Sequence, residues 1–87
     1  MKVIAKPIEV VAWFGNEGII NPVRFRIKDD EDGYKVIKID KIIKRETEKL
    51  AGNLMDKFTC VAVVNGIEKI FEIKYEKFTS KWILFKI

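Results

Sequence analysis

Apolar and polar side chains alternate along most of this chain. Residues 23–28 show the pattern most plainly, with one side of an extended strand apolar and the other basic: Val23, Phe25 and Ile27 against Arg24, Arg26 and Lys28. A period of two, combined with many β-branched and aromatic residues, is typical of half-buried strands. The pattern predicts strands over residues 3–14, 19–28, about 34–43, 58–64, 67–75 and 82–87.

The sharpest local signal is the dipeptide Asn65-Gly66, which lies between two alternating runs. Asn-Gly is the preferred pair for a two-residue type I′ hairpin, because both central residues need a positive φ. A hairpin of this type places Val64 opposite Ile67, Cys60 opposite Phe71 and Phe58 opposite Ile73. It also sets Thr59 opposite Glu72 and Val61 opposite Ile70.

Residues 34–39 depart from simple alternation. Tyr34 and Val36 share one side of a strand, whereas Ile37 and Ile39 share the other. A one-residue change of register exchanges the core and solvent sides, so one regular strand cannot bury both pairs. Either a bulge near Val36-Ile37 or burial of both sides resolves the conflict, and we favour the bulge because a strongly curved sheet needs one.

Residues 44–53 are the one stretch whose composition favours a helix. Glu46 and Glu48 precede Lys49, and Gly52 suits a helix C-terminus. We expect at most one or two helical turns there, because an isolated helix this short is marginal. The whole chain, residues 1–87, is therefore expected to be a single all-β or mainly β domain. About six antiparallel strands would form a small curled sheet or a partly open, SH3-like barrel, since closure protects strand edges.

The amino-acid composition excludes several kinds of functional site. The 87 residues include one cysteine, Cys60, and no histidine, which excludes an intramolecular disulfide and any Cys–His metal site. Histidine is also the commonest acid–base side chain near neutral pH. No catalytic motif is found, so we expect no enzymatic activity, no metal and no cofactor. The longest apolar run, residues 60–64, is far shorter than the roughly 20 residues of a membrane span, and we expect a soluble, cytoplasmic protein without a membrane partner.

The charge balance is mildly basic, with 17 Lys and Arg against 13 Asp and Glu. The stripe Arg24, Arg26 and Lys28, with Lys38 on the neighbouring strand, is a candidate contact surface for nucleic acid or another anion. The alternative is a solvated face whose charges pair with Asp40 and the acidic loop. We favour this alternative, because the aromatic residues mostly fall in the core phase, whereas nucleic-acid-binding sheets expose them.

Three further features have a functional and a structural interpretation. Trp13 and Trp82 flank turns or termini, so they are candidate partner contacts, although core packing at the barrel ends is favoured. The acidic loop 29–33 invites a calcium interpretation but lacks the spacing of a calcium-binding loop. Cys60 is expected to be a buried, inert thiol, since no histidine is present to activate it.

The order of features also carries a resemblance. The relevant segments are Pro7-Ile8-Glu9-Val10, Pro22-Val23-Arg24-Phe25-Arg26, Tyr34 to Ile39, Phe71 to Tyr75 and Lys81-Trp82-Ile83-Leu84. In this order they resemble a family of small uncharacterised bacterial β-domain proteins. The resemblance implies a small β-domain and assigns it no known role.

Two functional hypotheses follow. The first is a non-enzymatic small β-barrel module that binds another protein or itself, with the last strand pairing with a second copy to form a homodimer. The second is a nucleic-acid-binding small barrel that uses the basic stripe.

Overall fold

Seven antiparallel strands form one curled sheet in the computed structural model, which describes residues 1–87. The strands are β1 (Val3–Phe14), β2 (Ile20–Lys28), β3 (Tyr34–Lys38), β4 (Lys41–Leu50), β5 (Asn53–Val64), β6 (Ile67–Glu76) and β7 (Lys81–Lys86). Their order across the sheet is β3-β2-β1-β7-β6-β5-β4. The predicted all-β class and partly open barrel are confirmed, with seven strands where about six were expected.

The extra strand is β4, which occupies the segment whose composition favoured helical turns. It pairs with β5 from Lys41 opposite Val61 to Leu50 opposite Asn53. Helix propensities differ by only some tenths of a kcal/mol per residue among most residue types. Pairing with β5, interrupted only between Ile42 and Lys44, outweighs that preference, so the expected helical segment is wrong and the chain contains no helix. No segment is therefore a helix long and apolar enough to span a membrane.

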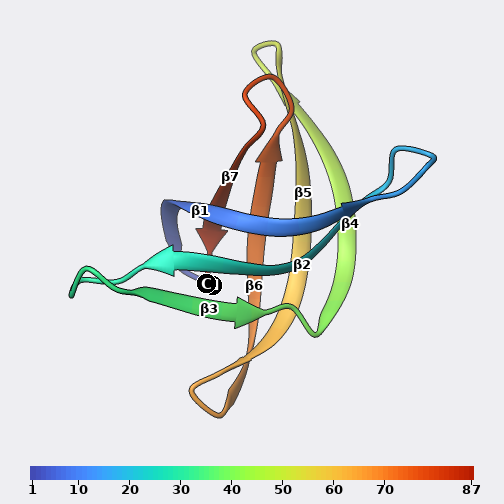
Figure 1. The fold of residues 1–87 in the computed structure, drawn as a ribbon. Coiled ribbons are helices and arrows are strands. Elements are labelled where there is room, and N and C mark those ends of the chain that lie inside the picture. Colours follow the sequence, from blue (N-terminus) through green and yellow to red (C-terminus); the bar gives the residue numbers. More distant parts are fainter.

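Strand β1 takes part in both halves of the curled sheet. Its first part, through Ile8, pairs with β7, and its second part, from Glu9 onward, pairs with β2. The pairing with β7 is interrupted between Val3 and Lys6, and Ala5 in this interval has a φ of 45°. Strand β1 bends at this irregularity just before Pro7, and β1–β3 then run across β4–β7 (Figure 1).

The hydrophobic core fills the space between these two layers. Phe25 of β2 and Phe71 of β6 meet with ring centroids 5.5 Å apart and are almost fully buried. Trp82 closes one end, with its ring 5.7 Å from Phe58 and 4.8 Å from Tyr75. Arg45 of β4 donates to the Ile20 carbonyl, which ties the β4 edge to the start of β2.

The predicted β5–β6 hairpin is confirmed residue by residue. Val64 faces Ile67, Cys60 faces Phe71 and Phe58 faces Ile73, with Thr59 opposite Glu72 and Val61 opposite Ile70. Asn65 and Gly66 have φ values of 52° and 78°, as a type I′ turn requires.

The conflict in residues 34–39 is resolved without the expected bulge. Pairing between β2 and β3 is regular from Arg24 opposite Lys38 to Lys28 opposite Tyr34. Ile37 and Ile39 are buried, whereas Tyr34 and Val36 are 52% and 63% exposed. The predicted strand 34–43 is instead divided at Ile39-Asp40, where the Ile39 amide donates to Val23 of β2 and the Asp40 amide donates to Val61 of β5.

Strand β7 lies inside the sheet. It pairs with β6 on one side and with β1 on the other. The hypothesis that the last strand pairs with a second copy is therefore wrong, because neither of its edges is free. The free edges of the sheet belong to β3 and β4.

Candidate functional site

The solvent side of β1–β3 carries the residues that the sequence singled out. We call it the outer face, and it consists of the outward side chains of the three strands: Glu9, Val11, Trp13, Arg24, Arg26, Lys28, Tyr34, Val36 and Lys38. The register places them in cross-strand rows. One row is Val11, Arg24 and Lys38, the next is Glu9, Arg26 and Val36, and the third is Lys28 and Tyr34. The four predicted basic residues therefore lie together on one face.

Arg26 at the middle of the outer face is held in a fixed orientation. Its Nε and Nη2 donate to the two carboxylate oxygens of Glu9, at 3.1 and 3.2 Å. Its guanidinium carbon lies 4.1 Å from the centroid of the Tyr34 ring. The hydrogen bonds to Glu9 raise the pKa of Arg26, so it stays charged and oriented.

The other three cations of the outer face make no ion pair. Arg24, Lys28 and Lys38 are exposed, and none lies within salt-bridge distance of a carboxylate, whereas Arg26 does. Two of the acids that were expected to neutralise this stripe accept backbone hydrogen bonds instead. Asp40 Oδ2 accepts from the Val63 amide, and Asp29 Oδ1 accepts from the amides of Glu31 and Gly33. The predicted pairing with Asp40 and the acidic loop does not form.

Aromatic and aliphatic side chains lie exposed among these cations. Tyr34 is 52% exposed, Val36 63% and Val11 51%. Glu9, Val11, Arg24, Arg26 and Val36 line a hollow in this face. Tyr34 and Val36 were not predicted to lie on this face, because the expected bulge would have turned them inward. Their position on the strand side opposite Ile37 and Ile39 was the signal that would have identified them as the outward pair.

The two tryptophans that were candidate partner contacts have different positions. Trp82 is only 9% exposed and packs in the core. Trp13 is 74% exposed and lies on the outward side of β1, at the end nearest the β1–β2 turn. Trp13 is therefore placed where a partner could touch it, and Trp82 is not.

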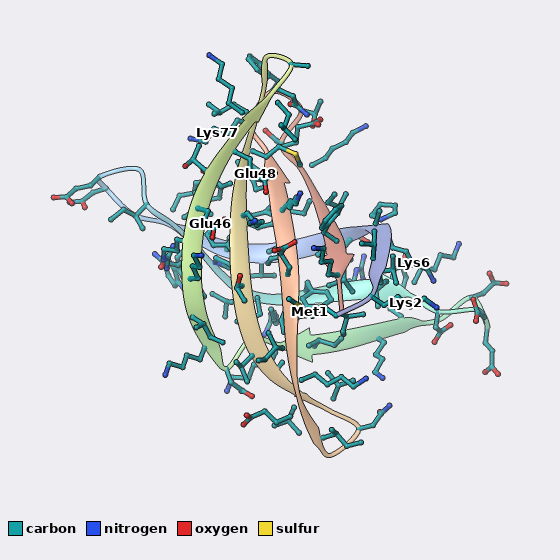
Figure 2. The ribbon with its side chains drawn as sticks, turned by 180° about the vertical axis from the view of Figure 1, so that it is seen from behind. Met1, Lys2, Lys6, Glu46, Glu48 and Lys77 are labelled. Carbon is teal, nitrogen blue, oxygen red and sulfur yellow. The ribbon has the colours of Figure 1, made fainter.

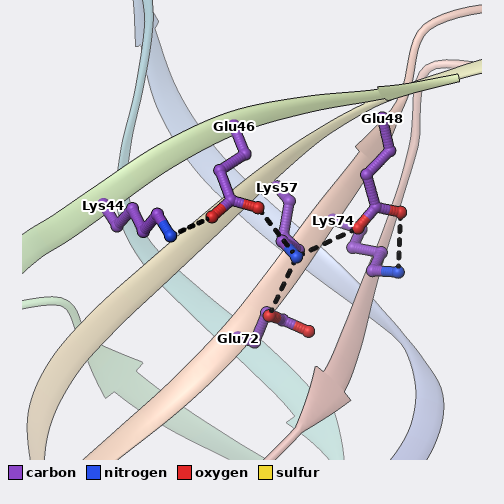
Figure 3. Close-up of polar contacts among 6 residues, drawn as sticks. All are labelled: Lys44, Glu46, Glu48, Lys57, Glu72 and Lys74. Atoms are coloured by element: carbon purple, nitrogen blue, oxygen red, sulfur yellow. Dashed lines mark hydrogen bonds and ion pairs between the residues drawn. The ribbon is translucent and has the colours of Figure 1, made fainter.

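The reverse side of the molecule carries a different, balanced charge cluster (Figure 2). On β4–β6, three lysines alternate with three glutamates: Lys44, Lys57, Lys74, Glu46, Glu48 and Glu72. Lys57 Nζ lies 2.9 Å from Glu46, 3.1 Å from Glu48 and 3.6 Å from Glu72 (Figure 3). Each charge has a partner within the cluster, so these ion pairs connect neighbouring strands and leave no charge free for a ligand.

The other candidate groups, which are the Cys60 thiol, possible metal ligands and the acidic loop, form no site at the surface either. Cys60 is fully buried, and burial raises the pKa of its thiol to about 12. No three His, Cys, Asp or Glu side chains come together as metal ligands. The acidic loop folds back on itself through the bonds that Asp29 accepts from Glu31 and Gly33.

Comparison of the chain with protein-family models, with curated proteins and with solved structures found no match. The resemblance to a bacterial β-domain family therefore stays a prediction. The exposed cations and apolar side chains of the outer face are therefore the basis for a functional proposal.

Proposed function

We propose that this protein is a small, non-enzymatic binding module whose contact surface is the outer face of β1–β3 and whose partner is an anionic macromolecule. The observation that carries this proposal is the set of unpaired cations: Arg24, Lys28 and Lys38. Natural surfaces normally intersperse charges of both signs. A face with four cations and one carboxylate, Glu9, attracts polyanions and speeds their association.

The exposed apolar residues support a contact surface over a merely solvated one. Val11, Val36, Tyr34 and Trp13 are each at least half exposed and lie between or beside the cations. Grouped exposed apolar side chains with a polar rim mark binding surfaces more often than inert ones. The neutral cluster around Lys57 offers neither free charge nor exposed aromatic rings, so it is the weaker candidate.

The non-enzymatic part of the proposal rests on the state of the reactive groups. The one thiol is buried, and the carboxylates around Lys57 are held by lysines. A single buried cysteine also agrees with a reducing compartment, and we propose the cytoplasm as the location.

Retention on immobilised heparin tests this surface directly. The double variant Arg24→Ala/Lys38→Ala removes two of the unpaired cations, and we expect it to elute at clearly lower salt than the wild type. The matched control is Lys2→Ala/Lys49→Ala, which removes two exposed lysines outside the outer face and gives the same net charge. We expect this control to elute close to the wild type.

Equal losses in the two double variants would contradict the proposal, because retention would then follow net charge alone. Circular dichroism of each variant verifies that the fold is intact. All four substituted side chains are exposed, so none of the changes removes a core contact.

A further inference from the structure

The arrangement around Arg26 is more specific than a basic patch. Two hydrogen bonds to the carboxylate oxygens of Glu9 fix the orientation of the guanidinium, which lies against the Tyr34 ring. Because Glu9 balances its charge, Arg26 is a poor free ligand for a phosphate. With Tyr34 it instead forms a shelf of two planar groups at the solvent surface, in which the guanidinium carbon lies 4.1 Å from the centroid of the Tyr34 ring.

The unpaired cations surround this shelf. Arg24 and Lys28 are two residues before and after Arg26 on the same strand, which places each about 6.6–6.8 Å along β2 from Arg26. Lys38 is opposite Arg24 on β3, about 4.8 Å away across the ladder. Cations therefore flank a planar shelf on both sides at the spacing of alternate strand residues.

We infer that the outer face binds single-stranded nucleic acid, with one base stacked on the Tyr34–Arg26 shelf and the flanking phosphates on Arg24, Lys28 and Lys38. This inference rests on the proposed function and names its partner. Single-stranded binders combine a cationic track with planar side chains that accept unpaired bases. Val11 and Val36 lie beside the shelf in neighbouring rows and offer apolar contact to a base or a sugar.

Other anionic partners match only part of this face. In a duplex the bases are stacked on one another and are reached through a groove by an inserted helix or β-ribbon. A planar shelf cannot stack on paired bases, so a duplex would use the cations alone. An acidic peptide likewise satisfies the cations but brings no flat rings for the shelf.

Fluorescence anisotropy with a labelled single-stranded oligonucleotide of about 12 nucleotides tests the inference, since single-strand sites cover roughly 4–16 nucleotides per module. For three phosphate contacts we expect log K to fall with log salt at a slope of about −2. The Arg24→Ala/Lys38→Ala variant should reduce the slope to about −0.7.

The Tyr34→Ala variant separates stacking from charge. Loss of one stacked base is expected to weaken binding by roughly 5-fold to 150-fold at an unchanged salt slope. Tyr34→Phe keeps the ring and should bind like the wild type. Phe78→Ala is the matched control, because Phe78 is a 78% exposed aromatic residue outside the outer face.

Three results would overturn the inference: a duplex binding as tightly as the single strand, polyglutamate of equal charge competing as well as unlabelled oligonucleotide, or Tyr34→Ala behaving like Phe78→Ala. Effective competition by polyglutamate would assign the face to an acidic protein. If the heparin result still depends on Arg24 and Lys38, the proposed binding surface stands and only the single-stranded partner is wrong. If the Arg24→Ala/Lys38→Ala variant is also retained on heparin as strongly as its control, both proposals fail.

Discussion

At the scale of single residues, Lys57 and its neighbours show how charge is used on the reverse side of the sheet. Lys57 lies within 3.6 Å of three carboxylates on two other strands. The hydrogen bonds from Lys44 and Lys57 lower the pKa of Glu46 to about 2, and those from Lys57 and Lys74 also lower the pKa of Glu48. Hydrogen bonds to Glu46 and Glu48 in turn raise the pKa of Lys57. The charged form of each group is therefore favoured by folding.

These shifts predict a loss of stability in acid. A glutamate in the unfolded chain has a pKa of about 4.3, so the contribution of Glu46 is complete above that pH and disappears as the pH falls toward about 2. We expect the free energy of unfolding, measured by urea titration across this range, to fall less steeply for Glu46→Gln than for the wild type. Glu17→Gln, in the β1–β2 turn and in no ion pair, is the control. Parallel curves for wild type and Glu46→Gln would contradict this account.

Cys60 provides a second test at this scale. Its pKa of about 12 leaves almost no thiolate at pH 8, and the side chain has no exposed surface. We expect a disulfide reagent such as dithionitrobenzoate to leave the native thiol unmodified at pH 8 and to modify it fully in denaturant. The chain contains no other cysteine, so the signal needs no correction. Rapid modification of the native protein would show that the β5–β6 core opens.

At the scale of elements, the β5–β6 hairpin organises the larger layer of the sheet. Its two-residue turn fixes which side chains of β5 and β6 face the core, because each register shift of one residue would exchange the two sides. Gly66 has a φ of 78°, and a Cβ added there would meet no atom within 4 Å. The cost of a side chain at this position is therefore purely conformational.

Gly66→Ala is expected to lower the free energy of unfolding by about 1 kcal/mol, because a Cβ disfavours the left-handed region by roughly 1–2 kcal/mol. Urea denaturation at constant m-value measures the change. Gly15→Ala is the matched control, since its φ is not positive and its added Cβ would make only an ordinary contact, 3.4 Å from the Ile19 carbonyl oxygen. Equal stabilities of the two variants would show that the turn does not need a left-handed residue.

At the scale of the whole molecule, the two free edges decide whether copies of the chain associate. The edge strand β3 has only five residues. Strand β4 is longer, but its pairing is irregular between Ile42 and Lys44, and it carries charges at Lys41, Lys44, Arg45 and Lys49. Short strands, bulges and lysines are the devices by which proteins protect open edges from pairing.

We therefore expect a monomer of about 10.2 kDa in sedimentation equilibrium at physiological salt. Raising the protein concentration into the hundreds of micromolar range should leave the mass unchanged. A dimer would contradict this expectation, and its loss in a Thr47→Pro variant would place the contact at the β4 edge, because a proline there removes one backbone donor.

Much of the fold follows from local pattern. The alternation of residues 23–28, the ends of β1 and the full register of β5–β6 were all predicted, because side-chain period and turn φ values are properties of neighbouring residues. The basic residues of the outer face were also identified in this way. The common side of Arg24, Arg26 and Lys28 needs only the period of two, whereas Lys38 joins them through the pairing of β3 with β2.

The remaining features depended on contacts between residues far apart in the chain. The residue pattern alone predicted every strand except β4, together with the Asn65-Gly66 turn and the basic stripe. The tertiary structure made residues 41–50 a strand, because β5 supplies the pairing partner that their composition does not reveal. It also decided that β7 lies between β1 and β6, and that Ile37 rather than Val36 points inward. Burial in a two-layer sheet selects one side of each strand for the core, and for β3 this choice left Tyr34 at the surface beside Arg26.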